Sequence, residues 1–176
     1  DLEILTSFVK QHGDIAFNRR HDLAVNHPRY EDLTIGHCVE TAWIVDRAAK
    51  KVLMIHHNFL QRWLAPGGHC DDIDQQPGDA AIREAKEETG ILLPSNTRAR
   101  LFDMDIHPIP ANPKKNEPAH LHLGTTWLIE ADSTQELSLQ EAEISDCKWV
   151  PFSDIPTESS DPNDSFARLK VKSLAL

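Results

Sequence analysis

The sequence predicts an α/β fold in which helices cover both faces of a mixed β-sheet. Two observations support this: strand-like runs alternate with helical segments, and no repeat runs along the 176-residue chain. Apolar residues make up 40% of the chain and charged residues 26%, as in ordinary globular proteins. A chain of this length is most simply one domain, residues 1–176, with its own core.

The N-terminal part of the chain, residues 1–36, is expected to hold a helix followed by an irregular segment. Apolar residues recur with a helical period within residues 2–12, namely Leu2, Leu5, Phe8 and Val9. Residues 13–36 are mostly polar and include Pro28, which breaks regular structure. Strand-like sequence begins only after this segment.

Five strand-like runs predict the sheet. The first two, residues 38–45 and 52–57, are joined by a short polar linker and predict a β-hairpin, although the linker is longer than the ideal one. The later runs are residues 98–107, 120–130 and 145–150. Residues 108–118 contain four prolines and are expected to form an irregular loop.

A central helix is predicted over residues 77–89. Pro77 suits its first position, Asp79 lies in its first turn, and Gly90 stands where a C-cap glycine belongs. One side of this helix is small and apolar, which predicts close packing on a sheet; it consists of Ala80, Ala81, Ile82 and Ala85. A second, terminal helix is expected from about residue 162 to residue 174, with Asp161 as N-cap and Pro162 in the first position.

The opposite side of the central helix carries three acids. Glu84, Glu87 and Glu88 have the spacing i, i+3 and i+4, which places them on one helix face about 5–6 Å apart. Their mutual repulsion would be relieved by a divalent cation, and oxygen ligands suit Mg²⁺ or Mn²⁺. The alternative is a solvated acidic face. The glycine turn expected at Pro66-Gly67-Gly68 and the apolar side favour the metal site.

Residues 66–91 resemble the Nudix box, whose pattern is G-x5-E-x7-R-E-U-x-E-E-x-G-U, where U is aliphatic. The second half matches closely through Arg83-Glu84-Ala85, Glu87-Glu88 and Gly90-Ile91. In the first half, the position of the first glutamate is taken by Asp74 when counted from Gly68, or by Gln75 when counted back from Arg83. This indicates a one-residue insertion and leaves the role of the first acid open.

The resemblance implies a Nudix-like α/β/α sandwich in which residues 66–91 form the catalytic loop and helix. It implies a metal-dependent hydrolase that cleaves the phosphoanhydride bond of a nucleoside diphosphate linked to another moiety, or of a related small diphosphate. Glu84, Glu87 and Glu88 would bind the metal, with Gly68 supplying a carbonyl or allowing close approach. Arg83 would orient the acids by pairing with Glu87; an ordinary helix salt bridge is the alternative.

A further acid is expected near the last strand. Glu143 precedes a Trp-Val-Pro segment at the spacing typical of the family, so it is a candidate fourth ligand or general base. Glu141 is the second candidate. Both could equally be solvated loop acids in an acidic protein.

The chain has ten histidines, and several lie in or beside the predicted strands. His69 follows Gly68 directly, while His120 and His122 alternate and therefore face the same side of a strand. We expect these three to line the pocket, with purely structural roles as the alternative. Trp63 is a candidate for base stacking, although core packing is the simpler role. A zinc site has no recognisable ligand spacing.

The net charge of −10 argues against a nucleic-acid or anionic-membrane surface. Three widely spaced cysteines without a C-x-x-C pair point to a reducing cytoplasm rather than to a disulfide framework. The family resemblance admits a homodimer, but no sequence feature selects one, and none names the substrate. A nucleotide-binding or sensing domain without catalysis is the alternative function. It is disfavoured because Glu84, Glu87 and Glu88 are all present.

Overall fold

The structure is a computed structural model that describes residues 36–71, 73–74, 76, 78–113, 118–140, 142–157 and 165–176. The chain divides into two compact units, residues 1–34 and residues 35–176, and the described residues all belong to the second. The helix predicted at residues 2–12 and the irregular segment after it lie outside the described residues. The single-domain organisation stays a prediction.

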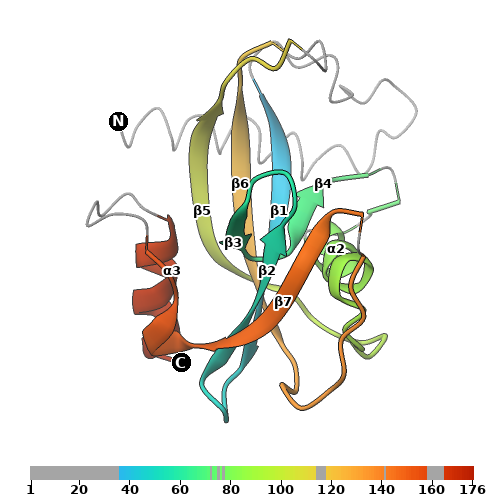
Figure 1. Cartoon of the computed structure of the whole chain (residues 1–176), viewed down its shortest axis with the longest axis vertical. Helices are drawn as coiled ribbons and strands as arrows, with labels where there is room; N and C mark the ends of the chain where they lie inside the picture. Colours follow the sequence, from blue (N-terminus) through green and yellow to red (C-terminus); the bar gives the residue numbers. More distant parts are fainter. Residues whose placement is uncertain are drawn as a thin grey trace. The chain divides into compact units, whose positions relative to one another are not determined.

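One mixed sheet of seven strands forms the centre of the second unit (Figure 1). The strands are β1 Gly36–Asp46, β2 Lys51–His57, β3 Arg62–Leu64, β4 Gly67–His69, β5 Arg100–Ile109, β6 His120–Glu130 and β7 Ile144–Pro151. The helices described are α2 Asp79–Thr89, α3 Ser165–Leu174 and the short 3-10 helix η2 Phe152–Asp154. None of these helices is long and apolar enough to cross a membrane.

The strand order is β3-β2-β1-β6-β5, with β4 paired to β1 and β7 paired to β2. β1 and β6 run parallel, and every other pair is antiparallel. The predicted hairpin is confirmed, because β1 and β2 pair with Val45 opposite Val52. The three later strands are also confirmed, with β5 displaced by two residues from its predicted bounds.

Three local predictions need correction. Gly78 is the N-cap of α2, with φ at 88°, so the first helical residue is Asp79 and not Pro77. The glycine segment is not a tight turn, because Gly67 to His69 is extended and pairs with Val39 to Thr41 of β1. Finally, β5 continues into the proline-rich segment through Ile109. The edge position of β5 in the sheet allows this, since an edge strand can accommodate Pro108.

The C-cap of α2 and the beginning of the terminal helix were also predicted. Gly90 is the C-cap of α2 as predicted, with φ at 64° and its N–H donating to the carbonyl oxygen of Lys86 at 2.9 Å. The described part of the terminal helix begins at Ser165, and its predicted cap residues Asp161 and Pro162 lie outside the described residues.

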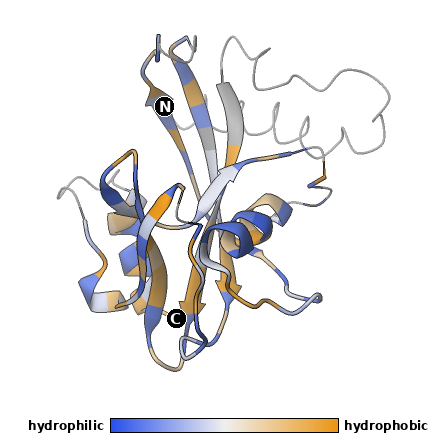
Figure 2. Ribbon diagram, turned by 45° about the vertical axis from the view of Figure 1, so that its right-hand side comes forward, coloured by the Kyte–Doolittle hydropathy of each residue, from blue (hydrophilic) through white to orange (hydrophobic). Residues whose placement is uncertain are grey.

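Two apolar cores lie on the two faces of the sheet. Consecutive residues of β1 from Ala42 to Val45 are all fully buried, as expected for a strand covered on both sides. Trp43 and Val45 face the core that includes Leu169 of α3, whereas Ala42 and Ile44 face the core that includes Ala81 and Ala85 of α2. Figure 2 shows the hydrophobic residues gathered on the strands between the two helices. The α/β/α sandwich is thus confirmed.

Candidate functional site

Glu88 is a buried acid held against the first residue of β4. Its side chain lies in the last turns of α2 and is only 4% exposed, and its Oε2 atom accepts a hydrogen bond from the backbone N–H of Gly67 at 3.0 Å. Burial raises the pKa of Glu88 to about 8, against the lowering effect of the Gly67 hydrogen bond. The negative charges of Glu84, Glu143 and Glu87 raise it further. Four acids therefore influence one another here.

Glu84 lies one turn earlier, directly against Gly68. A Cβ atom added to Gly68 would overlap the Oε1 atom of Glu84 and lie 2.7 Å from its Cδ atom, so a glycine is needed for this approach. The carboxyl group is partly buried, and burial raises its pKa above the ordinary value. The hydrogen bond from Arg83 opposes that rise. The predicted role of Gly68, a carbonyl for the metal or close approach to it, stays a prediction.

Arg83 connects the loop before α2 to two of the acids. Its strongest partner is Asp74, which receives two hydrogen bonds, from Nε at 3.2 Å and from Nη2 at 3.0 Å. Arg83 also donates to Glu84 at 2.8 Å and, over a longer distance of 3.4 Å, to Glu87. Chiefly through Asp74, these partners raise the pKa of Arg83 above its ordinary value. The predicted pairing with Glu87 exists but is the weaker contact.

Asp74, one of the two residues that the sequence offers for the first acid of the box, contacts Arg83. Its side chain is only 7% exposed and is turned towards the guanidinium group of Arg83. Gln75 lies outside the described residues. Asp74 therefore holds Arg83 in place. The sequence alone could not predict this contact, because it depends on how the loop before α2 folds.

The beginning of α2 is capped by an acid that the sequence did not point to. Glu40 of β1 is buried, and its two carboxylate oxygens accept hydrogen bonds from the N–H groups of Gly78 at 3.1 Å and Ala81 at 3.3 Å. Burial raises the pKa of Glu40, and these hydrogen bonds partly offset the rise. A polar residue inside an apolar strand run was the one available signal in the sequence.

Glu143 is exposed and lies in the loop that precedes β7. This loop is attached to the end of α2, because the N–H groups of Ser138 and Gln140 donate to the carbonyls of Thr89 and Glu88 at 2.8 and 3.2 Å. The charge of Glu143 raises the pKa of Glu88, so the two acids are close enough to interact. Glu141, the second candidate, lies outside the described residues.

The acids are unequal in exposure. Glu88 is buried, Glu84 is 18% exposed at its side chain, and Glu87 is 53% exposed. Within the described residues, no three His, Cys, Asp or Glu side chains surround a common point that would hold a metal ion. By donor chemistry, however, a set of carboxylate oxygens around a buried acid is what a hard divalent cation binds. A cation would also stabilise the ionised form of Glu88.

A hollow on the outer side of α2 gives access to part of this cluster. Its lining residues come from the loop before α2 and from the helix itself; they are Ile73, Asp74, Asp79, Ile82, Arg83, Lys86 and Glu87. The charged groups of Arg83 and Lys86 are the positive members of this lining. The lining thus combines three acids, Asp74, Asp79 and Glu87, with two basic residues.

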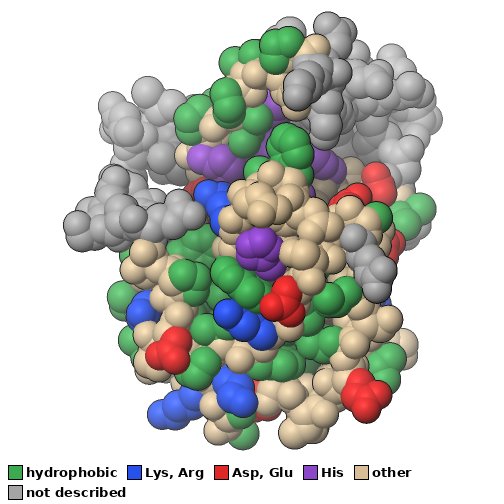
Figure 3. Space-filling model, viewed as in Figure 1, with side chains coloured by type: hydrophobic (Ala, Val, Ile, Leu, Met, Phe, Trp, Pro, Cys, Tyr) green, Lys and Arg blue, Asp and Glu red, His purple; other side chains and the backbone are tan. Residues whose placement is uncertain are grey.

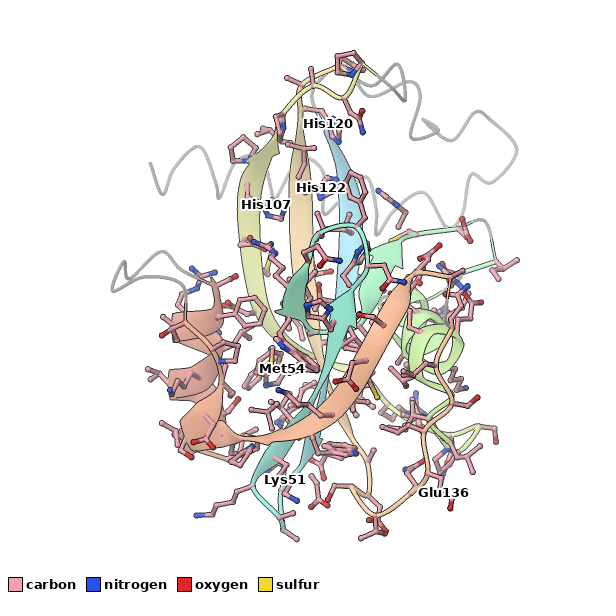
Figure 4. The ribbon with its side chains drawn as sticks, viewed as in Figure 1. Lys51, Met54, His107, His120, His122 and Glu136 are labelled. Carbon is pink, nitrogen blue, oxygen red and sulfur yellow. The ribbon has the colours of Figure 1, made fainter. Side chains whose placement is uncertain are left out.

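The predicted pocket histidines do come together. The ring of His122 lies 5.7 Å from that of His69 and 5.3 Å from that of His120, measured between centroids. His107 of β5 also joins them, at 5.3 Å from His122. Figure 4 shows His107, His120 and His122 along β5 and β6, and Figure 3 shows histidines gathered on this face.

Trp63 packs on the face of the sheet that α3 covers. It is partly buried and packs against the core that contains Trp43 and Met54. The Nζ atom of Lys148 lies 3.8 Å from the centre of its ring, and the ring of His56 lies 5.3 Å away. Core packing, the simpler of its two predicted roles, is present; the stacking role stays a prediction.

The sequence matches the family model described as NUDIX domain over residues 37–169. A protein of Lactococcus lactis subsp. cremoris (strain MG1363), called "Probable DHNTP pyrophosphohydrolase", is 34% identical over 102 residues, which are 58% of this chain and 54% of the relative. The "m7GpppN-mRNA hydrolase NUDT17" of Danio rerio is 30% identical over 131 residues, covering 68% of this chain and 43% of the relative. The chain thus spans about half the length of these relatives.

Solved structures share the fold. The dihydroneopterin triphosphate pyrophosphohydrolase of E. coli aligns with a TM-score of 0.59 and 16% identity, covering 76% of this chain and 94% of that one. An Ap4A hydrolase binary complex from C. elegans aligns with a TM-score of 0.58 and 20% identity, covering 79% and 97%. At such identities the similarity concerns the fold alone.

Proposed function

This chain belongs to the NUDIX family, since the family model matches residues 37–169, and we propose that it is a metal-dependent pyrophosphohydrolase. Its reaction would be hydrolysis of the phosphoanhydride bond in a nucleoside diphosphate linked to another moiety, or in a related small diphosphate. The names of the two curated relatives, which refer to DHNTP and to m7GpppN-mRNA, support a phosphorylated substrate.

The observation that carries this proposal is the interaction of three acids with one buried carboxyl group. Glu88 is held at Gly67 although Glu84, Glu87 and Glu143 all make its ionisation less favourable. A purely structural acid at a buried site gains no stability from three acidic neighbours. Such an arrangement is typical of a functional site, where unfavourable charge is compensated by a ligand.

In the proposed site, Glu84, Glu87 and Glu88 would hold Mg²⁺ or Mn²⁺, with Gly68 contributing its carbonyl or allowing close approach. When bound, the cation supplies polarisation of a phosphoryl oxygen and a more acidic water. The protein itself contributes the placement of these acids. The hydrogen bond from Gly67 holds Glu88, and the absence of a side chain at Gly68 leaves room for Glu84.

Two further residues are proposed for catalysis. Arg83, fixed by Asp74, keeps Glu84 and Glu87 oriented through hydrogen bonds from its Nη1 atom at 2.8 and 3.4 Å. Glu143 is exposed on a loop that is attached to the end of α2, so its carboxylate can take up a proton from the attacking water as general base. Glu87 and Glu88 would contribute to catalysis by holding the cation in position.

For the substrate, we propose contacts with His69, His120, His122 and Trp63. The three imidazoles form one group, and that group begins at the residue after Gly68. An imidazole nitrogen can donate to phosphate when it carries a proton and can accept from a heterocycle when it does not. With a protein charge of −10, a polyphosphate is bound favourably only where cations or such donors meet it.

The test is a hydrolysis assay on nucleotide-sugars, dinucleotides, deoxynucleotides and acyl-CoA compounds with and without Mg²⁺. We expect Mg²⁺-dependent release of a phosphorylated product and loss of turnover in Glu87→Gln, whose half-exposed side chain can be changed without disturbing the core. Glu136→Gln, on an exposed loop, is the matched control. Tight binding of one nucleotide without turnover across the panel would instead support a non-catalytic binding domain.

A further inference from the structure

A carboxylate and an imidazole form a pair on β5, outside the acidic cluster. The Nδ1 atom of His107 lies 2.8 Å from the Oδ2 atom of Asp105, two residues earlier on the same face of the strand. Both side chains are partly accessible, at 45% for His107 and 29% for Asp105. In the pairing of β5 with β6, His107 lies opposite His122 and Asp105 lies opposite Gly124.

Gly124 provides the space that the carboxylate of Asp105 occupies. A Cβ atom added to Gly124 would overlap the Oδ1 atom of Asp105 and lie 3.3 Å from its Cγ atom. Any other residue at position 124 would therefore displace this carboxylate. The pair thus depends on a residue of the neighbouring strand, and its geometry is held from two sides: by His107 and by the gap at Gly124.

The partners of the imidazoles determine which ring nitrogen carries the proton. An ionised carboxylate has only acceptor atoms, so Nδ1 of His107 must be the donor in the hydrogen bond to Asp105. The same holds for His120, whose Nδ1 lies 2.8 Å from the carbonyl oxygen of Pro118. When neutral, the His107 ring therefore presents a lone pair at Nε2. Such an atom accepts hydrogen bonds and does not donate them.

The pair belongs to a row of imidazoles on one face of the sheet. The His107 ring is 5.3 Å from the ring of His122, which is 5.7 Å from the ring of His69. His69 follows Gly68, against which the carboxyl group of Glu84 lies. Successive side chains of a strand point to opposite faces, so the imidazole of His69 lies on the face of β4 opposite to Glu84. The imidazoles share with Asp103 the face of the sheet that α3 covers. Among the described residues, no three His, Cys, Asp or Glu side chains surround a common point.

We propose that Asp105 is a positioning residue for His107, and that Nε2 of His107 accepts a hydrogen bond from a hydroxyl or ring N–H group of the non-phosphate part of the substrate. The chemistry selects this part, because phosphate oxygens are acceptors and are repelled by a lone pair. The carboxylate of Asp105 adds a negative charge that disfavours phosphate at the same place. The substrate role rests on the proposed function, whereas the positioning role does not.

The positioning role is tested by nitrogen-15 NMR of histidine-labelled full-length protein. The His107 signals are identified by their loss in His107→Gln. We expect a proton on Nδ1 and none on Nε2 in the native protein, and altered His107 signals in Asp105→Asn, whose neutral amide removes the negative charge beside Nδ1. Gly124→Ala should disturb the same signals by displacing Asp105. Asp103→Asn, on the same face of β5 but bound to Arg168 and Lys172, should leave them unchanged.

A native His107 protonated at Nε2, or signals that Asp105→Asn does not alter, would overturn the positioning role. The substrate role is tested on the compound that the hydrolysis panel identifies. We expect Asp105→Asn and His107→Gln to raise KM about tenfold while kcat changes little, the effect of one lost hydrogen bond. An unchanged KM would overturn it.

A protein without turnover is still informative for both roles. In that case the native protein is titrated with guanosine and adenosine 5′-diphosphates, and the His107 Nε2 signal is followed. A shift of this signal that is absent in Asp105→Asn supports recognition at His107. No shift with either nucleotide overturns it. The tautomer measurement is unaffected by the loss of the proposed catalytic function, so the two failures can be told apart.

Discussion

The Oε2 atom of Glu88 accepts a hydrogen bond from the backbone N–H of Gly67 at 3.0 Å, which joins the end of α2 to the beginning of β4. This contact places a buried acid directly beside the strand that carries Gly68 and His69. Its energetic consequence can be measured without knowledge of the substrate.

The pKa of Glu88 predicts how stability depends on pH in the absence of metal. Burial raises this pKa from 4.5 to about 8, so between these values the folded protein keeps a proton that the unfolded chain releases. The contribution of Glu88 to stability is complete below pH 4.5 and is lost as the pH rises to about 8. Each pKa unit corresponds to about 1.4 kcal/mol, so the loss is on the order of a few kcal/mol.

Urea unfolding in EDTA at several pH values between 5 and 8 measures this loss. We expect Glu88→Gln to flatten the pH dependence, because glutamine can accept from Gly67 without an ionisable group. Glu136→Gln serves as a control at an exposed position. Parallel curves for the native protein and Glu88→Gln would contradict the assignment.

Gly68→Ala should move the carboxyl group of Glu84. The added Cβ would lie 2.7 Å from Cδ of Glu84, which requires a shift of the side chain or of β4. Because these atoms of Glu84 are the far end of a flexible side chain, we expect a loss of less than about 1 kcal/mol in the free energy of unfolding. We also expect at least a tenfold decrease in turnover, on the order of 1.4 kcal/mol in transition-state stabilisation.

A double variant separates the two effects. In Gly68→Ala/Glu84→Ala the blocking group is gone, so stability should recover relative to the sum of the two single variants, while turnover stays low. Chemical denaturation of all four proteins gives the coupling energy. Additive destabilisation would show that the two residues are not in contact.

Asp74→Ala should destabilise the loop before α2. It removes two hydrogen bonds to Arg83, and both side chains are largely buried, at 7% and 15% exposure. We expect a loss of about 2 kcal/mol or more in the free energy of unfolding. Asp71→Ala is the control, because Asp71 is exposed and lies 3.7 Å from Arg83; it should change stability by less than about 0.5 kcal/mol. Equal effects of both variants would refute the special role of Asp74.

Glu40→Ala should loosen the beginning of α2. The variant leaves the N–H groups of Gly78 and Ala81 without their carboxylate partner, and loss of a helix cap costs about 0.5–2 kcal/mol. Hydrogen exchange at these two amides should accelerate, together with a decrease in Tm. Glu136→Ala, whose position is visible in Figure 4, should not change hydrogen exchange at either amide. Unchanged exchange in Glu40→Ala would contradict the capping role.

Local features of the fold were readable from the sequence where they depend on neighbouring residues. The C-cap at Gly90 and the hairpin of β1 and β2 both follow from short-range preferences, and both are confirmed. The start of α2 was predicted two residues too early. The reason is distance along the chain. The N–H groups at the start of α2 bind the carboxylate of Glu40, which lies 38 residues before the N-cap residue Gly78 and meets it only in the folded protein.

The sequence by itself determined the α/β class, the acidic helix face and the likeness of residues 83–91 to a metal-binding helix. These features depend on periodicity and on spacing within one element, which the chain order contains. The roles proposed for the acids and histidines stay predictions. The tertiary structure alone decided that Asp74 holds Arg83 and that Asp105 fills the space at Gly124. Each of these contacts joins two separate parts of the chain. Which residues meet there depends on how the elements pack, and their spacing along the chain does not reveal it.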